Sequence, residues 1–121
     1  AIVFESEKSC LKMASFFGAE NDNSVAVCGS NLTLQQFELL KAAGAKEICI
    51  AFDRQYHESN FRDEEWKGWT RKLKGLAAKY GGEVLITFMF DKKNRLGYKD
   101  SPIDKGKEIF LELFKERFSI S

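Results

Sequence analysis

Five consecutive apolar residues at positions 48–52 (Ile-Cys-Ile-Ala-Phe) leave no polar side to meet water. A strand of this kind is buried on both sides, as in parallel sheets that are covered by helices on both faces. Further apolar runs alternate along the chain with segments of helical periodicity. The alternation predicts an α/β fold, a parallel four-stranded sheet flanked by helices on both faces, with strands at residues 2–5, 24–28, 47–52 and 83–90.

Local signals predict where the helices between the strands begin and end. A first helix is expected at residues 8–17. The second is expected to begin after Thr33, because Gln36 three residues later completes a capping box, and to end at Gly44. The third carries one apolar stripe, which consists of Trp66, Trp69, Leu73, Leu76, Ala77 and Tyr80.

The last helix is predicted from a different set of signals. Ser101 is expected at its N-cap, Pro102 at its first position and Asp104 as the acid that bonds back to the cap. Its inward face is expected to carry Phe110, Leu113, Phe114 and Phe118.

Length and charge limit the classes of protein that fit. At 121 residues the chain fits one domain, and no stretch approaches the roughly 20 apolar residues that span a bilayer. The net charge of +1 argues against binding of nucleic acid by overall charge alone, so a polyanion would need a local basic patch. Cys10, Cys28 and Cys49 are widely spaced and odd in number, which predicts buried thiols in the cytoplasm and no disulfide framework or zinc site. The sequence begins as a strand and ends as a helix, so we expect it to be one piece of a longer polypeptide.

Three predicted strands end in an acid. Glu5, Asp53 and Asp91 follow the first, third and fourth apolar runs. The carboxyl ends of parallel strands share one edge, beside the crevice where such folds bind ligands. Converging carboxylates need a positive partner, and Mg²⁺ (or Mn²⁺) suits hard oxygen ligands. The alternative for each residue is a solvated turn, and for Asp100 and Asp104 it is a role at a helix N-terminus.

Basic residues cluster in the segment between residues 91 and 100. At the same edge of the sheet, this segment could bind triphosphate or template backbone, although lysine-rich surface loops are common. The predicted nucleotide- and nucleic-acid-binding residues are Lys8, Gly29, Arg54, Lys92, Lys93, Arg95 and Lys99. His57 is expected to be a solvated histidine, because no Cys or His lies at metal-ligand spacing from it.

The order of these motifs resembles the Toprim domain shared by topoisomerases and primases, and more closely that of bacterial-type and phage primases. In that family a glutamate ends the first strand, a glycine follows the second, Asp-x-Asp ends the third and further acids follow the fourth. The corresponding segments here are Ile2-Val3-Phe4-Glu5, Val27-Cys28-Gly29-Ser30, Ile50-Ala51-Phe52-Asp53 and, similar to the primase Lys-Asp-Pro-Asp segment, Lys99-Asp100-Ser101-Pro102-Ile103-Asp104.

The resemblance implies a function for the matching residues. Asp53 would bind Mg²⁺ and Glu5 would either join it or move a proton, in template-directed nucleotidyl transfer. Glu5, Asp53, Asp91 and Asp100 are the predicted metal ligands. The chain departs from the family at Gln55, where the second aspartate is expected. An amide offers an oxygen without charge, so either one metal site is weakened or Glu58 substitutes.

The same resemblance implies binding partners, and alternative functions remain open. A primase core would act on single-stranded DNA and nucleoside triphosphates, work with a replicative helicase, and be inactive as an isolated domain. The alternatives are a Toprim nuclease, a signalling receiver domain that accepts phosphate on Asp53, and an inert nucleic-acid-binding or scaffolding module. A receiver should have a fifth strand followed by a lysine.

Overall fold

The computed structural model describes residues 1–18, 20, 22–29, 31–57, 64–91, 93 and 95–119. Its sheet has four parallel strands in the order β2-β1-β3-β4. The strands are β1 (Ile2–Phe4), β2 (Ser24–Ala26), β3 (Glu47–Ala51) and β4 (Leu85–Phe88). The predicted α/β fold is confirmed, with each strand shorter than the apolar run that predicted it.

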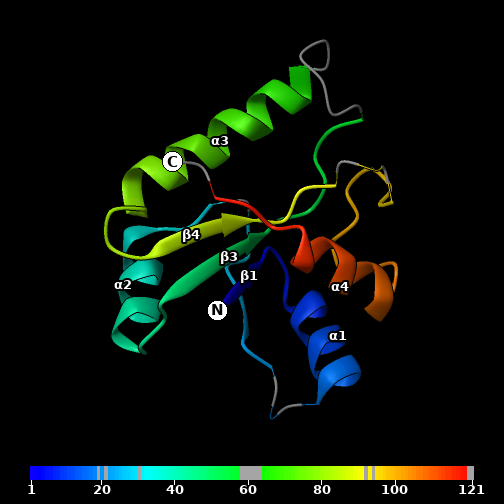
Figure 1. Cartoon of the computed structure of the whole chain (residues 1–121), viewed down its shortest axis with the longest axis horizontal. Coiled ribbons are helices and arrows are strands. Elements are labelled where there is room, and N and C mark those ends of the chain that lie inside the picture. Colours follow the sequence, from blue (N-terminus) through cyan, green and yellow to red (C-terminus); the bar gives the residue numbers. More distant parts are fainter. Residues whose placement is uncertain are drawn as a thin grey trace.

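Helices cover both faces of the sheet (Figure 1). α1 (Glu7–Phe17) and α4 (Lys107–Lys115) lie on one face, and α2 (Leu34–Ala42) and α3 (Glu64–Tyr80) lie on the other. Successive residues of a strand point to opposite faces. Ile48 and Ile50 of β3 therefore join the core under α2 and α3, while Cys49 and Ala51 join the core under α1 and α4.

The predicted ends of α2 and the stripe of α3 are confirmed. The Thr33 backbone N–H donates to Gln36 Oε1 at 2.9 Å, and the Gln36 backbone N–H donates to Thr33 Oγ1 at 3.2 Å. Gly44 follows the helix with φ of +92°, a conformation that favours glycine. Trp69, Leu73, Leu76 and Tyr80 are buried, as the helical spacing predicted.

The predicted start of the last helix is wrong. α4 begins at Lys107, and residues 102–105 form a turn. The Ser101 backbone N–H donates to Asp104 Oδ2 at 2.8 Å as expected, but the Asp104 backbone N–H donates to the Ser101 carbonyl and not to its hydroxyl, which accepts from Ser9 Oγ at 2.8 Å. Phe118 lies beyond the helix, where it forms an antiparallel bridge with Phe88 of β4.

The cysteines differ in their exposure, and the helices were compared with the length of a membrane span. Cys49 is buried, but Cys28 is exposed and Cys10 is partly exposed, so the prediction of three buried thiols is correct only for Cys49. Among the described residues, no helix combines the length and the apolar character needed to cross a membrane.

Candidate metal centre

Glu5 and Asp53 meet at the carboxyl edge of the two central strands. β1 and β3 pair in parallel with Phe4 opposite Ala51, and each acid follows its strand within two residues. The Asp53 backbone N–H donates to Glu5 Oε2 at 2.6 Å. The strand register thus brings together the two residues that the sequence analysis assigned to catalysis.

Gln55 binds the Glu5 carboxylate as well. Its side-chain Nε2 donates to Glu5 Oε1 at 3.1 Å and to Oε2 at 3.2 Å. Only the amide NH₂ can donate to a carboxylate, so this contact sets the orientation of the Gln55 side chain. An aspartate at this position would repel Glu5, whereas the amide stabilises it. The amide oxygen was expected to face a metal, whereas the amide nitrogen of Gln55 faces Glu5.

The Asp53 side chain lacks a positive partner among the described residues. Its Oδ1 is buried and has no hydrogen-bond partner. Burial, followed by the nearby charges of Glu5, Asp104 and Asp100, raises the pKa of Asp53 to about 7. A buried, unsatisfied acceptor is unfavourable. A cation beside Oδ1 would satisfy the oxygen and favour the ionised carboxylate.

Asp100 and Asp104 lie near Asp53 and add negative charge around it. Asp100 Oδ2 accepts from the Gly97 backbone N–H at 2.7 Å and lies 3.6 Å from Lys105 Nζ. Asp104 accepts from the Ser101 backbone N–H through Oδ2 and from Lys12 Nζ through Oδ1, both at 2.8 Å. These bonds shape the turn at residues 97–104. The helix that was expected to begin here begins at Lys107, so both acids stabilise a turn and not a helix N-terminus, while their charges act on Asp53.

The residues present fit a divalent ion held by few protein ligands. The described residues contain no group of three His, Cys, Asp or Glu side chains arranged to hold a metal. Mg²⁺ usually binds one or two carboxylates and completes its shell with water and substrate phosphates. Asp53 offers an unsatisfied oxygen and Glu5 lies directly beside it. The donor set therefore fits one Mg²⁺ or Mn²⁺ ion with an incomplete protein shell.

Asp91 and Arg54 form a buried structural pair away from these acids. Asp91 Oδ1 accepts from the Arg95 backbone N–H at 2.9 Å, and Oδ2 accepts from the Leu96 backbone N–H at 2.8 Å and from Arg54 Nη1 at 3.3 Å. Arg54 also donates to the backbone carbonyls of Tyr56, His57 and Leu96. Both side chains are buried and engaged, so the structure gives Asp91 no place in the metal site and Arg54 no access to nucleic acid.

The other predicted basic residues are scattered. Arg95 is directed to Glu112 and Glu116 of the α4 region at 2.9 and 3.0 Å. Lys93 is exposed and lies 4.0 Å from Glu116. Lys8 is exposed on α1, and Lys99 lines the cleft described below.

Three residues of the sequence analysis lie outside the described residues. These are Lys92, Glu58 and Ser30. Gly29, which follows β2, donates its backbone N–H to the Glu5 carbonyl at 3.2 Å. This contact holds the chain after β2 against the end of β1.

A cleft of about 610 Å³ opens beside the acids. One side consists of Glu5, Asp53 and Gln55, and α3 supplies the opposite side through Glu65, Gly68, Trp69 and Lys72. Tyr98 and Lys99 complete the lining. The sequence analysis assigned α3 to the core and missed Lys72. The available signal was the i, i+3, i+7 spacing of residues 65, 68 and 72, which places them along one side of the helix.

His57 is exposed, as predicted, and its ring also contacts two residues of the cleft. Its ring stacks on Tyr98 with centroids 4.1 Å apart, and its Nδ1 lies 3.0 Å from Glu65 Oε1. The Tyr98 hydroxyl donates to the same Glu65 carboxylate. These three side chains link the segment after β3, the turn after β4 and the start of α3 at the mouth of the cleft.

Comparisons with known proteins agree with this architecture. The chain is 37% identical over 124 residues to the SPbeta prophage-derived uncharacterized protein YorJ of Bacillus subtilis (strain 168), in an alignment that covers 98% of this chain and 32% of that protein. The chain thus spans about a third of the length of the curated relative that it matches. No solved structure matches it. Residues 1–55, which contain Glu5, Gly29, Asp53 and Gln55, match the family described as Toprim domain, whose members generally bind divalent metal ions.

Proposed function

We propose that the chain is the metal-binding catalytic core of a DNA primase, which supports Mg²⁺- or Mn²⁺-dependent, template-directed synthesis of RNA primers. The observation that carries the proposal is the buried Asp53 oxygen without a hydrogen-bond partner, set beside Glu5 at the carboxyl edge of the sheet. The match of residues 1–55 to the Toprim domain supports a metal-dependent role in nucleic-acid metabolism.

Each residue of the site would have a separate role in this reaction. Asp53 and Glu5 hold the ion, and Gln55 together with the Asp53 backbone N–H fixes the Glu5 carboxylate in place. When bound, the ion positions the incoming triphosphate and offsets negative charge as pyrophosphate leaves. Lys99 and Lys72 line the same cleft and can bind phosphate oxygens.

The resemblance of residues 99–104 to the primase Lys-Asp-Pro-Asp segment is the feature that favours a primase over a Toprim nuclease. The Arg54 backbone N–H donates to the Asp100 carbonyl at 2.9 Å, and the Lys99 backbone N–H donates to the Arg54 carbonyl at 2.6 Å. Two backbone hydrogen bonds therefore hold this segment against Arg54, the residue between Asp53 and Gln55. A nuclease would share the sheet and the acids, so it remains the second candidate.

A receiver domain fits the structure less well. The described residues form four parallel strands, and the residue that extends the sheet beside β4 is Phe118, in an antiparallel bridge. We further propose that the domain acts in the cytoplasm as part of a longer polypeptide, on single-stranded DNA and nucleoside triphosphates, with a replicative helicase as partner.

Manganese binding tests the metal site directly. Free Mn²⁺ is measured by electron paramagnetic resonance during titration of the wild-type chain, Asp53→Asn and Glu5→Gln. We expect one bound ion in the wild type and at least a roughly tenfold weaker affinity in both variants, because each loses a charged ligand. Glu38→Gln is the matched control, since it removes one exposed acid on α2. Equal affinity in wild type and Asp53→Asn would refute the site.

Product analysis then separates the two candidate activities. The full-length polypeptide is incubated with single-stranded DNA, labelled nucleoside triphosphates and Mg²⁺. A primase yields template-dependent labelled primers that disappear in Asp53→Asn. Cleavage of the DNA without incorporation would instead establish the nuclease.

A further inference from the structure

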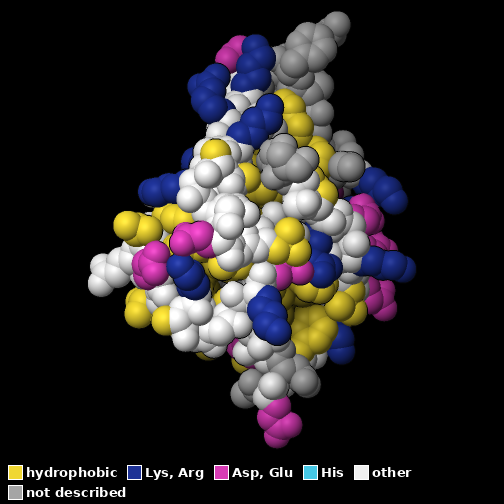
Figure 2. Space-filling model, turned by 60° about the vertical axis from the view of Figure 1, so that its left-hand side comes forward, with side chains coloured by type: hydrophobic (Ala, Val, Ile, Leu, Met, Phe, Trp, Pro, Cys, Tyr) yellow, Lys and Arg dark blue, Asp and Glu magenta, His cyan; other side chains and the backbone are white. Residues whose placement is uncertain are grey.

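α3 carries a net positive charge, although the chain as a whole is nearly neutral. This helix holds five of the 19 Lys and Arg residues and two of the 18 Asp and Glu residues, so its net charge is +3 and that of the remaining chain is −2. Figure 2 shows Lys and Arg side chains gathered at the top of the view, where α3 lies. The net charge of the whole chain is therefore small although α3 is clearly positive and the remaining residues are slightly negative.

The cations of α3 lie on its outer face. Lys67, Arg71 and Lys74 follow the i, i+4, i+7 spacing of one helix face, and all three are exposed. They span about 10 Å along the helix axis. Lys67 pairs with Glu64 at 3.1 Å, whereas Arg71 and Lys74 have no acidic partner within the described part of the chain. An exposed pair such as Lys67 with Glu64 contributes little and is easily exchanged for a phosphate.

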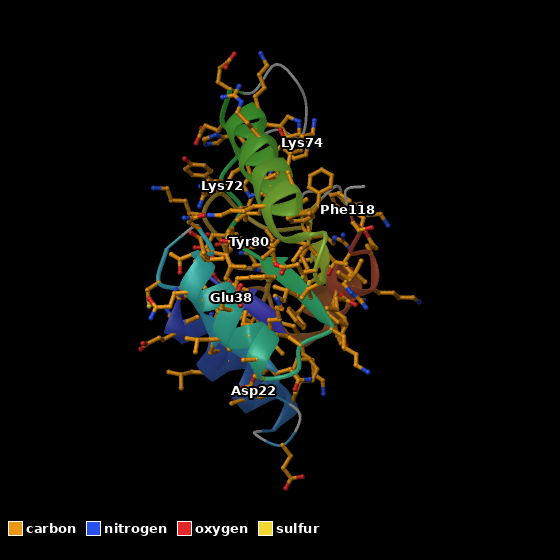
Figure 3. The ribbon with its side chains drawn as sticks, turned by 90° about the vertical axis from the view of Figure 1, so that its left-hand side faces the viewer. Asp22, Glu38, Lys72, Lys74, Tyr80 and Phe118 are labelled. Atoms are coloured by element: carbon orange, nitrogen blue, oxygen red, sulfur yellow. The ribbon has the colours of Figure 1, made fainter. Side chains whose placement is uncertain are left out.

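One further cation connects this face with the candidate metal centre. Lys72 lines the cleft that contains Glu5 and Asp53, whereas Lys74 lines an apolar groove on the other side of the helix with Phe90 and Phe118. In Figure 3, Lys72 and Lys74 leave α3 on opposite sides. A strand that crosses the outer face of α3 would therefore reach the acids past Lys72.

The helix backbone is also open to close approach. Gly68 and Gly75 stand inside α3, although glycine in a helix interior costs about 1 kcal/mol relative to alanine. A Cβ added at either position would meet nothing within 4 Å, so packing within the described residues does not require glycine there. Glycine leaves room for a partner's backbone beside the basic side chains.

We propose that the outer face of α3, formed by Lys67, Arg71 and Lys74, binds the phosphate backbone of a nucleic-acid strand and guides it past Lys72 into the cleft. The inference deepens the proposed function, on which it rests for the identity of the polyanion. Because the contacts are to phosphates, binding requires no metal and carries little sequence preference.

The test measures the salt dependence of binding. A fluorescent single-stranded oligonucleotide is titrated with the chain in EDTA at several NaCl concentrations. Three neutralised phosphates give a slope of log affinity against log salt of about −2. The variant Arg71→Gln with Lys74→Gln should lower the magnitude of this slope by about 1.4 and weaken binding roughly 10- to 30-fold near 0.1 M salt.

A charge-matched control isolates the role of position. Lys46→Gln with Lys115→Gln removes the same charge from exposed residues outside α3, one before β3 and one on α4. This control should keep the wild-type slope. Equal losses in both double variants, or no detectable binding of the wild type at low salt, would overturn the proposal. The Mn²⁺ titration reports on the metal site, and the oligonucleotide titration in EDTA contains no free metal, so a failed metal site and a failed α3 surface give different results.

Discussion

Asp53→Asn is expected to stabilise the metal-free protein at alkaline pH. In the unfolded chain the Asp53 carboxyl ionises near its ordinary pKa of 3.8, whereas in the folded chain burial and the acids around it raise the pKa to about 7. Between these values the folded chain holds the extra proton, so the free energy of unfolding falls as the pH rises and the whole penalty is present above pH 7. Asparagine cannot ionise and avoids the penalty.

The size of the effect follows from the shift. A change from 3.8 to about 7 corresponds to about 4 kcal/mol at 1.4 kcal/mol per pH unit. Asp53 is only half-buried, and solvent screening reduces this figure to about 2 kcal/mol. The Asp53 backbone N–H that donates to Glu5 is unchanged by the substitution, so the local hydrogen bond remains.

Urea unfolding in EDTA, near pH 4 and near pH 8, measures this difference. The two proteins should be about equally stable near pH 4, and the variant should be about 2 kcal/mol more stable near pH 8. Mg²⁺ at a fixed concentration at pH 8 should raise the stability of the wild type more than that of the variant, because the variant binds the ion more weakly. Glu38→Gln, the exposed control, should show no such dependence. A variant less stable than the wild type at pH 8 would refute the reasoning, because the carboxylate would then have a favourable partner.

Three other substitutions test separate parts of the structure. Asp91→Asn should lower the free energy of unfolding by about 3 kcal/mol, because it removes the charge that faces the buried guanidinium of Arg54; a loss below about 1 kcal/mol in urea unfolding would contradict this. Gln55→Asp should destabilise the metal-free chain by about 1 kcal/mol through lost bonds to Glu5 but tighten Mn²⁺ binding in the resonance titration; unchanged affinity would count against the role of site charge. Gly75→Ala should raise the unfolding free energy by about 0.5–1 kcal/mol, since the added Cβ meets no atom within 4 Å; thermal unfolding that shows a loss would contradict it.

Local patterns predicted the sheet and the pair of acids well. The apolar runs predicted four parallel strands because such runs, alternating with helices, are typical of parallel sheets covered on both faces. The Thr33–Gln36 capping box was predictable because its bonds join residues three apart. The meeting of Glu5 and Asp53 followed from parallel pairing alone, since adjacent strands end at one edge.

Contacts between distant residues explain what the sequence did not predict. Ser101 has the pattern of an N-cap, but Ser9, 92 residues away, occupies its hydroxyl, and α4 begins six residues later at Lys107. Phe118 continues the apolar spacing of α4 but pairs with Phe88 across the sheet. Lys72 shares one side of α3 with residues 65 and 68, but that spacing does not say that this side of the helix faces the cleft, which is formed with residues that follow β1, β3 and β4.

Arg54 shows how a charged residue can serve a site without reaching a ligand. Arg54 lies between Asp53 and Gln55, so fixing its backbone also fixes the backbone positions of these two neighbours. Its guanidinium is held by the carbonyls of Tyr56, His57 and Leu96 and by Asp91, and its own backbone N–H and carbonyl bond the turn that contains Asp100. Its buried bonds therefore join the segment after β3 to the segment after β4. The acids of the candidate metal centre lie in these two segments and directly after β1. Arg54 therefore fixes the positions of these segments relative to each other, and its own charge is neutralised inside the protein. Positive charge for the polyanionic ligand of the proposed function must then come from other residues, and Lys72 on α3 and Lys99 after β4 both line the cleft.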